Sequence, residues 1–302
     1  MYDIIVVGGG PAGMTAALYA RRNGKTVLVI EKNGFGGQIT SSPKVENYPG
    51  TLSMSGNEFA EQTLDQILQQ GAEIEVGTVD SIDASASPMR VTTEEGDSFE
   101  CSSVIIATGV KHRMLGLEGE EEMIGEGISF CAVCDGDFYT GKKVCVAGGG
   151  NSALQEAILL AEKCSQVTIL QDLPHLTGEP RMQDILKAKD NVNIITDVKF
   201  TGILTEGGNF SGVSIERAGS PENVPCDGLF VAVGLIPENG PFSALADLNG
   251  YGYFKSGEDC LTKTPGVYVA GDCREKSVRQ LATAISDGAS AALAACSYLN
   301  GL

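Results

Sequence analysis

The residues of this chain best suited to chemistry form one short run, Cys131-Ala132-Val133-Cys134-Asp135-Gly136, in which two cysteines three positions apart precede an acid. Two thiols at this spacing can close a disulfide that is easily reduced. The adjoining carboxyl of Asp135 is placed to move the protons that thiol–disulfide exchange requires. The run therefore predicts a redox-active pair, Cys131 and Cys134, with Asp135 as acid and base. Such a pair needs a source of electrons.

A glycine-rich turn upstream of this run is a candidate site for an electron-carrying nucleotide. The turn, Gly8-Gly9-Gly10-Pro11-Ala12-Gly13, follows an apolar run over residues 3–7 and opens an alanine-rich segment. Glycines permit the tight turn and let backbone N–H groups approach a pyrophosphate at the positive end of the helix. Glu31 ends the next apolar run, close to the spacing of about 20 residues at which an acid holds ribose hydroxyls. Strand, turn, helix and acid together predict a dinucleotide site.

The same plan occurs a second time downstream of the cysteines. A predicted strand over residues 144–147 leads into Gly148-Gly149-Gly150-Asn151-Ser152-Ala153, followed by a predicted helix and a strand over residues 166–170. Residues 227–234 then repeat the apolar strand and glycine turn of residues 104–109, which end in Thr108 and Gly109. This internal duplication predicts an α/β chain with two Rossmann-like, three-layer dinucleotide-binding domains. The second domain, residues 113–239, is inserted into the first, residues 1–112 and 240–302.

Three further segments of the first domain carry polar residues suited to a large planar cofactor. Gly37 and Gln38 belong to a glycine cluster that allows close approach to a flat ring, and Gln38 and Asn47 could form hydrogen bonds with the edge of that ring. Near the C-terminus, the strand over residues 267–270 ends in Gly271-Asp272, where an acid suits a polyol or ribityl chain. Asp272 could equally cap a helix.

Composition excludes several classes of function. The chain has 302 residues, with 21 Lys and Arg against 39 Asp and Glu, and its formal charge of −18 disfavours binding to nucleic acid or to acidic membranes. No apolar run approaches the roughly 18 residues that a membrane span needs. Nine cysteines, mostly single and in apolar surroundings, indicate reduced thiols and predict a cytoplasmic protein. A structural zinc site at the paired cysteines would need two more ligands, and neither a second CxxC nor a His pair exists, so no metal is expected.

Together, in this order and at this spacing, the motifs closely resemble those of the low-molecular-weight thioredoxin reductases, over essentially the whole chain. The resemblance implies a homodimer that binds FAD in the outer domain, with the inserted domain carrying the disulfide, and thioredoxin or a thioredoxin-like protein as the acceptor. It implies that Cys134 faces the flavin and that Cys131 is its exchange partner. Only His112 and His175 exist, neither near the C-terminus, so Asp135 is the available acid.

By the same resemblance, the cofactor-binding residues divide between the two domains. The residues implied for FAD are Gly8, Gly10, Pro11, Ala12, Gly13, Glu31, Gly37, Gln38, Asn47, Thr108, Gly109, Asp272, Arg279, Gln280 and Leu281. Those implied for a pyridine nucleotide are Gly148, Gly150, Asn151, Ser152 and Ala153.

The chain departs from this family after its second turn. Members that use NADPH carry a His-Arg-Arg run there, which recognises the 2′-phosphate, whereas this chain has Gln171-Asp172-Leu173 and no Arg before Arg181. NADH is therefore the favoured donor. Two other donors remain open: a ferredoxin or a deazaflavin, with the inserted domain as a carrier, or NADPH bound through Arg181 or other cations. A ferredoxin, usually acidic, would need a local basic patch such as Lys142-Lys143 or Lys111-His112-Arg113.

One alternative function uses the same parts. A flavoprotein NADH oxidase that makes peroxide, or a reductase that serves a peroxidase system, would use the paired cysteines to recycle a peroxidase partner instead of thioredoxin. Turnover with thioredoxin, compared with turnover on oxygen alone, separates these alternatives.

Overall fold

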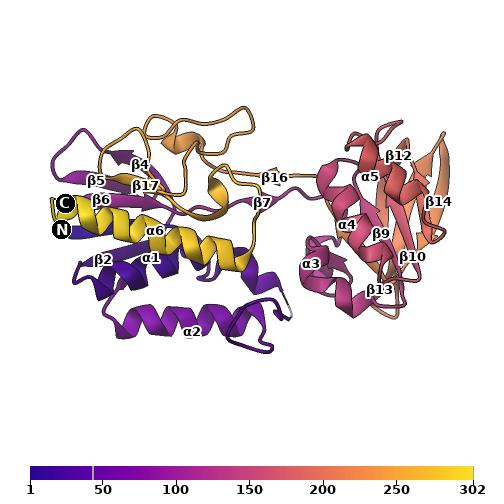
Figure 1. Cartoon of the computed structure of the whole chain (residues 1–302), viewed down its shortest axis with the longest axis horizontal. Helices are drawn as coiled ribbons and strands as arrows, with labels where there is room; N and C mark the ends of the chain where they lie inside the picture. The colour runs from indigo at the N-terminus through magenta and orange to yellow at the C-terminus, as the bar shows by residue number, and fades with distance from the viewer. Residues whose placement is uncertain (43, 302) are drawn as a thin grey trace. The chain divides into compact units, whose positions relative to one another are not determined.

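The computed structural model describes residues 1–42 and 44–301 and divides the chain into two compact units (Figure 1). The outer unit contains residues 1–111 and the chain from residue 236 onward, and the inserted unit contains residues 112–235. The chain passes between them in β7 (Lys111–His112) and β16 (Leu235–Ile236). The α/β class, with one unit inserted in another, agrees with the sequence prediction.

The outer unit resumes at residue 236, four residues before residue 240, where the sequence analysis set the domain boundary. Residues 236–239 belong to the outer unit. The Asn239 amide accounts for this, because it donates to the carbonyl oxygens of Gly252 (2.9 Å) and Cys273 (2.7 Å), and its oxygen accepts from Thr108 (3.2 Å). A polar side chain that is fully buried needs such partners, and all of them lie in the outer unit.

The outer unit is built on a sheet in the order β3-β2-β1-β6-β5-β4, with β17 paired to β6. Its strands are β1 (Tyr2–Val7), β2 (Val27–Glu31), β3 (Glu73–Val76), β4 (Val79–Asp83), β5 (Met89–Thr93), β6 (Ser98–Ile106) and β17 (Val267–Val269). The strands around β1 are parallel, while β4 and β5 run antiparallel. Parallel strands covered on both faces read as continuous apolar runs, which is why residues 4–7 carry no polar alternation.

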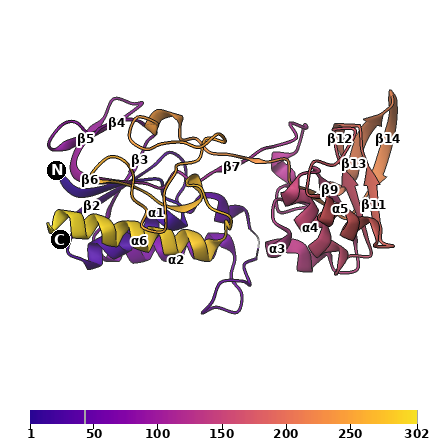
Figure 2. The same cartoon turned by 45° about the horizontal axis from the view of Figure 1, so that its top comes forward.

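Helices α1 (Pro11–Arg22), α2 (Gly56–Gln69) and α6 (Leu281–Leu299) cover one face of this sheet (Figures 1 and 2). Helices α6 and α1 pack closely, because a Cβ at Gly288 would lie 2.2 Å from the Ala12 carbonyl oxygen. Ser55 and Glu58 form a capping box that begins α2. The other face packs on residues near η4 (Gly240–Phe242), including the fully buried Phe254.

The inserted unit has an entirely parallel sheet in the order β11-β10-β9-β15-β8 and an antiparallel sheet in the order β12-β13-β14. The strands are β8 (Ile128–Ser129), β9 (Lys143–Ala147), β10 (Gln166–Leu170), β11 (Val192–Ile195), β12 (Val198–Glu206), β13 (Asn209–Arg217), β14 (Ser220–Pro225) and β15 (Gly228–Val231). The helices are η2 (Glu121–Met123), α3 (Ala132–Asp135), η3 (Gly136–Tyr139), α4 (Asn151–Ala161) and α5 (Pro180–Lys187). Strand β9 therefore occupies the same central place in this unit as β1 does in the outer one.

The pairing of the cysteines agrees with the sequence analysis, which expected one redox-active pair and otherwise reduced thiols. Cys131 and Cys134 form a disulfide, and the other seven cysteines are free and buried. In the part of the chain that the structure describes, no helix is long and apolar enough to cross a membrane. Within the same residues, no group of three or more His, Cys, Asp or Glu side chains is arranged to hold a metal ion.

Candidate redox and nucleotide sites

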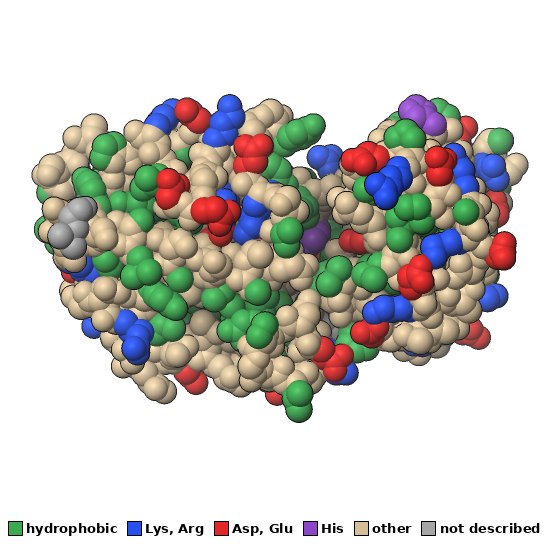
Figure 3. All heavy atoms as spheres, in the orientation of Figure 1, with side chains coloured by type: hydrophobic (Ala, Val, Ile, Leu, Met, Phe, Trp, Pro, Cys, Tyr) green, Lys and Arg blue, Asp and Glu red, His purple; other side chains and the backbone are tan. Residues whose placement is uncertain are grey.

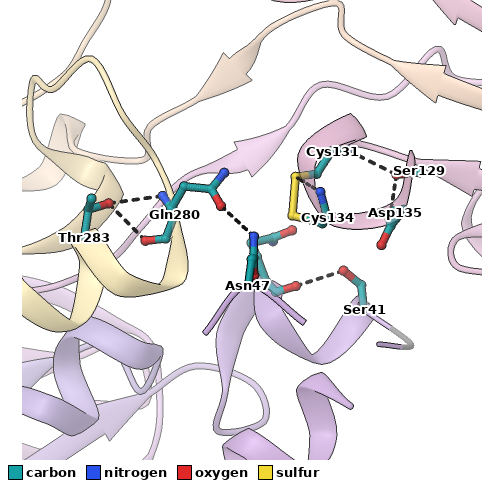
Figure 4. Close-up of a disulfide and its surroundings, with 9 residues drawn as sticks. Ser41, Asn47, Ser129, Cys131, Cys134, Asp135, Gln280 and Thr283 are labelled. Atoms are coloured by element: carbon teal, nitrogen blue, oxygen red, sulfur yellow. Dashed lines mark hydrogen bonds between the residues drawn. A yellow bond between two sulfur atoms is a disulfide. The ribbon is translucent and has the colours of Figure 1, made fainter. Parts of the chain in front are cut away.

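The Cys131–Cys134 disulfide lies at the start of the short helix α3 in the inserted unit (Figure 4). Cys131 has extended backbone and caps this helix, and its Sγ accepts a hydrogen bond from the backbone N–H of Cys134 at 3.2 Å. The two Cα atoms are 5.3 Å apart. A sulfur atom that already accepts an N–H bond at a helix start is stabilised further when it carries negative charge.

Asp135 ends α3 and is tied to the disulfide through Ser129 (Figure 4). The Ser129 hydroxyl donates to Asp135 Oδ2 at 2.6 Å and accepts from the backbone N–H of Cys131 at 3.1 Å. Asp135 Oδ1 is buried and has no hydrogen-bond partner. Burial raises the pKa of Asp135, and the bond from Ser129 opposes this rise without cancelling it. The carboxyl beside the disulfide is therefore suited to holding a proton.

Sequence reasoning missed Ser129. It lies two positions before the first cysteine, in strand β8, and no motif marks it.

The first turn, Gly8–Gly13, joins β1 to α1. Gly8 has a φ of +108°, and a Cβ there would lie 2.4 Å from the Ala107 carbonyl oxygen, so only glycine fits. A Cβ at Gly13 would lie 1.9 Å from the Gly8 carbonyl oxygen. Gly10 caps α1 without a side-chain hydrogen bond and Pro11 begins the helix, which leaves the N–H groups of the first helical turn available to a ligand.

Glu31, at the end of β2, is hydrogen-bonded to this turn. Its Oε2 accepts the backbone N–H of Gly9 at 2.6 Å, and its Oε1 accepts that of Asn33 at 3.0 Å. The carbonyl oxygen of Gly9 accepts the N–H of Gly36 at 2.9 Å. The turn and the glycine cluster after β2 are thus fastened together. Gly37, with a φ of +62°, lies against the Gly10 backbone.

Two residues predicted to lie near a flavin are brought together in the outer unit. The Asn47 amide donates to the Gln280 side-chain oxygen at 3.2 Å, although the two residues are 233 positions apart (Figure 4). Gln280 caps α6, the helix that begins at Leu281, so the predicted alternative role of Asp272 as a cap does not apply to this helix. Gln38 is exposed in η1 (Gly37–Ser41) and its side chain makes no hydrogen bond that ties it to Asn47.

Asp272 lies in η5 (Gly271–Cys273), directly after β17. Its Oδ1 is buried and accepts no hydrogen bond, although Lys276 Nζ lies 3.9 Å away as an ion pair. Burial raises the pKa of Asp272 against the lowering effect of Lys276 and Arg279. The Arg279 guanidinium stacks on the Tyr253 ring and donates to the carbonyl oxygens of Asp272, Arg274 and Lys276. Arg279 is therefore engaged by the backbone of its own loop. Asp272 Oδ1, by contrast, accepts no hydrogen bond.

A buried ion cluster that sequence reasoning missed supports this loop from α6. Asp287 accepts two bonds of 2.7 Å from Arg274 and also accepts from Lys276 (2.9 Å) and from the Gly271 N–H (3.0 Å). Burial would raise the pKa of Asp287, but the hydrogen bonds from Arg274 and Lys276 outweigh it and the pKa is lowered. An acid in the interior of an alanine-rich helix was the one available signal.

The second turn, Gly148–Ala153, repeats this backbone in the inserted unit. Gly148 has a φ of +122°, and a Cβ there would lie 2.6 Å from the Ala232 carbonyl oxygen. Gly150 caps α4, which begins at Asn151, again without a side-chain bond. Ala153 is fully buried, at the position where the first turn has a glycine. The predicted residues of this turn, Ser152 included, therefore lie together at one helix start.

The loop after β10 folds back over the second turn. The N–H groups of Thr177 and Gly178 both donate to the Gly149 carbonyl oxygen at 2.8 Å. Asn151 accepts the Glu179 N–H at 2.7 Å and donates to its carboxylate at 3.3 Å. Gln171 is buried beneath Gly149, where a Cβ on that glycine would lie 2.7 Å from the Gln171 side-chain carbon Cδ. Asp172, Leu173 and His175 are exposed.

Charge on the surface is mixed. On the face of each unit drawn in Figure 3, Lys and Arg side chains are interspersed with Asp and Glu. Of the predicted basic runs, Lys111 pairs with Glu238 at 2.8 Å and Lys142 lies over the Tyr139 ring.

Comparisons with known proteins show which family this chain is similar to. The family model described as pyridine nucleotide-disulphide oxidoreductase matches residues 2–288. The thioredoxin reductase of Listeria monocytogenes is 37% identical over 304 residues, covering 100% of this chain and 95% of that protein. The thioredoxin reductase of Bacillus subtilis is 36% identical, covering 100% and 96%. The crystal structure of thioredoxin reductase from Streptococcus pyogenes superposes with a TM-score of 0.94 at 37% identity, covering 100% of this chain and 99% of that one.

Proposed function

This chain belongs to the pyridine nucleotide-disulphide oxidoreductase family, within its low-molecular-weight thioredoxin reductases, and we propose that it reduces thioredoxin or a thioredoxin-like protein through FAD and the Cys131–Cys134 disulfide. One observation carries the proposal: a disulfide at a helix start is joined through Ser129 to a buried carboxyl that can hold a proton. That arrangement suits thiol–disulfide exchange.

The outer unit fits FAD. A helix start free of side-chain caps suits the pyrophosphate, and Glu31 suits the ribose of the adenosine half. Asp272 Oδ1, which accepts no hydrogen bond, suits a ribityl hydroxyl. Asn47 and Gln280, which form a hydrogen bond with each other, supply amide groups for the edge of a ring. Bound there, FAD would supply the electron pair that the disulfide takes up.

The residues of the inserted unit would handle the sulfur chemistry. Reduction breaks the sulfur–sulfur bond and takes up two electrons and one proton, which leaves one thiol and one thiolate. Asp135 would give the proton to one of the sulfur atoms, while the Cys134 N–H would stabilise negative charge on Cys131. The thiolate then attacks the disulfide of the acceptor to form a mixed disulfide and releases one acceptor sulfur. The second thiol loses its proton and attacks the mixed disulfide, so the Cys131–Cys134 disulfide re-forms and the acceptor, with that proton and one from water, leaves as a dithiol.

For the electron donor we favour NADH over NADPH. The 2′-phosphate of NADPH carries close to two negative charges, and at the position that should meet it the chain offers the exposed pair Asp172 and Leu173. Gln171, which takes the place of Glu31, is neutral and buried. A ribose 2′-hydroxyl needs only a hydrogen-bond acceptor, which Asp172 can supply.

A second candidate donor is a ferredoxin or a deazaflavin, with the inserted unit serving only as the carrier of the disulfide. The observation in its favour is that Asn151, the first residue of α4, is already engaged on both polar atoms by Glu179. A pyridine nucleotide at this helix start would have to displace that pair or accommodate it.

We also expect a homodimer, as the resemblance to the low-molecular-weight thioredoxin reductases implies, and a cytoplasmic protein, since its other seven thiols are free and buried. Sedimentation at several concentrations tests the dimer: a mass of one chain, about 31.5 kDa, at all of them would refute it.

The deciding experiment is an anaerobic titration of the purified, flavin-loaded protein with NADH, NADPH, reduced ferredoxin and a reduced deazaflavin in turn. Bleaching of the flavin identifies the donor, and addition of oxidised thioredoxin should restore the colour. Purified, folded protein that neither contains nor takes up FAD would refute the assignment. Flavin that is reduced but re-oxidised only by oxygen would instead support an oxidase.

A further inference from the structure

Two carboxyl groups of the inserted unit each have a buried oxygen atom with no hydrogen-bond partner. They are Asp135 Oδ1 and Glu156 Oε2, and among the described residues the only other buried side-chain nitrogen or oxygen atom in this state is Asp272 Oδ1 in the outer unit. A buried carboxylate oxygen without a donor is costly, whereas a protonated carboxyl is much less so. The two groups therefore favour holding protons.

The fold brings the two groups to one helix contact. Asp135 ends α3, and Glu156 lies in the middle of α4. The helices pack through Ala132 of α3, which belongs to the same core cluster as Leu154, Ala157 and Leu160 of α4. A Cβ at Gly136, directly after Asp135, would lie 3.4 Å from Leu160. Glu156 therefore emerges from the helix that supports the disulfide turn.

The charge of Asp135 acts on Glu156. Burial, and then the charge of Asp135, raise the pKa of Glu156 to about 8. Burial and the same Asp135 charge raise the pKa of Tyr139, in η3, to about 12, so Tyr139 stays protonated. Ser129 of β8, which donates to Asp135, is neutral, and Lys163 is paired with Asp137 of η3. None of these side chains is a cation paired with either carboxyl.

We propose that Glu156 is a positioning residue for the proton chemistry at the disulfide: it shares one proton with Asp135 at neutral pH and so keeps Asp135 supplied with it. This inference rests on the proposed function, in which Asp135 gives a proton to sulfur. When Asp135 gives this proton to sulfur, both carboxyls are left without one. Glu156, which is half-buried, then takes up a proton from water, and the pair again shares one proton. Two interacting carboxyls titrate as a pair, so the pair keeps one proton to a higher pH than Asp135 alone.

The test compares four holoenzymes: wild type, Glu156→Gln, Asp135→Asn and the double variant. In turnover with oxidised thioredoxin between pH 6 and 9.5, the wild-type rate should fall as the pair loses its proton near pH 8. In Glu156→Gln the fall should begin at lower pH, so that at pH 8 the rate is about tenfold below wild type while the low-pH plateau is kept. Asp135→Asn should remove this pH dependence, and adding Glu156→Gln to it should change nothing further.

A second readout does not depend on turnover. The infrared carbonyl band of protonated carboxyl groups at pH 7 should lose the intensity of one group in Glu156→Gln. In Asp135→Asn, the titration of Glu156 should move to lower pH, because the neighbouring negative charge is gone. This spectrum reports on the pair even if thioredoxin is not the acceptor, so failure of the proposed function and failure of this inference are distinguishable.

The matched control is Glu162→Gln. Glu162 follows the same helix, is exposed and pairs with Lys189, so its change should leave both the pH profile and the infrared band as in wild type. Flavin absorbance and melting temperature confirm that each variant is folded. An unchanged pH profile in Glu156→Gln, or an effect of Glu156→Gln that persists in the Asp135→Asn background, would overturn the proposal.

Discussion

The first and second glycine turns have nearly the same backbone and different chemistry around it. In both, the first glycine donates its N–H to the end of the second strand, Gly8 to Ile30 at 2.8 Å and Gly148 to Leu170 at 2.9 Å. In both, the middle glycine accepts from the loop that follows that strand. The residue that follows Ile30 in one unit and Leu170 in the other differs. Glu31 presents a carboxylate to Gly9, whereas Gln171 lies neutral and buried under Gly149.

The comparison teaches that duplication supplies the shape of a nucleotide site, while a few side chains after the second strand decide which ligand is bound. The outer unit combines its turn with Asp272, Asn47 and Gln280, all from distant parts of the chain. The inserted unit combines its turn with a loop that occupies Asn151. On this basis we propose that the outer unit binds the flavin and that the inserted unit carries out the sulfur chemistry. Four experiments follow from this proposal.

The largest expected effect comes from Cys134→Ser. This change removes the relay in the inserted unit and leaves the outer unit intact, so thioredoxin reduction should fall below detection while FAD content stays at about one per chain. Flavin absorbance and thioredoxin turnover, measured on the same preparation, check both halves. Retention of wild-type turnover would show that electrons bypass this disulfide.

Gly13→Ala should have the next largest effect, on flavin content. Its new methyl group would lie 1.9 Å from the Gly8 carbonyl oxygen, so the turn must open and FAD should be lost. The matched change is Ala153→Gly, which makes the second turn more like the first. It should keep the flavin and cost only about 0.5–1 kcal/mol of stability, because it places glycine in a helix. Full flavin content in Gly13→Ala would contradict the proposal that the outer unit binds FAD at this turn.

Changes in the loop after β10, which should meet the electron donor, should have a smaller effect, of about tenfold or more in kcat/KM for NADPH. A swap of Gln171, Asp172 and Leu173 to His-Arg-Arg would disturb the buried Gln171, so the sharper variant is Asp172→Arg with Leu173→Arg, both at exposed positions. One charge-assisted bond is worth about 1.5–3 kcal/mol, which predicts at least a tenfold gain in kcat/KM for NADPH.

In the unaltered protein, kcat/KM for NADPH should be at least about ten times below that for NADH, or neither coenzyme should reduce the flavin. The control is Glu206→Arg, an exposed charge reversal at the end of β12. It should leave kcat/KM unchanged for both NADH and NADPH. Efficient turnover of the unaltered protein with NADPH would refute our interpretation of this loop. A double variant still inert to both coenzymes would favour ferredoxin or a deazaflavin.

The smallest effect concerns acid stability. The folded-state pKa of Asp287 lies below its unfolded value, so its bonds to Arg274 and Lys276 stabilise the outer unit at neutral pH, and this contribution is lost as the pH falls below about 4 and through the folded pKa. Charge-assisted bonds of this kind suggest a loss of about 1–3 kcal/mol.

Peptide-resolved hydrogen exchange between pH 6 and pH 3.5, corrected for intrinsic rates, would measure this loss. Peptides from α6 should lose protection before those from α4. The reverse order would mean that Asp287 does not set the acid limit of the outer unit.

The sequence by itself determined the repeated strand-turn-helix plan, the paired cysteines with Asp135, and the departure at Gln171. These are local features, because a glycine turn, an apolar run and a CxxC are each defined by residues that are neighbours in the sequence. The residue at which the chain returns to the outer unit was harder to predict, because it depends on hydrogen bonds of Asn239 to Gly252 and Cys273.

Only the tertiary structure brought together Asn47 with Gln280, Asp287 with Arg274, and the α3 and α4 helices that carry Asp135 and Glu156. Ser129 likewise became visible only as the hydroxyl between Cys131 and Asp135. Such pairs arise where separate elements pack, and a buried oxygen without a partner can be recognised only after every neighbouring group has been placed. The sequence therefore revealed which chemistry is present, and packing decided where protons and charges can be held.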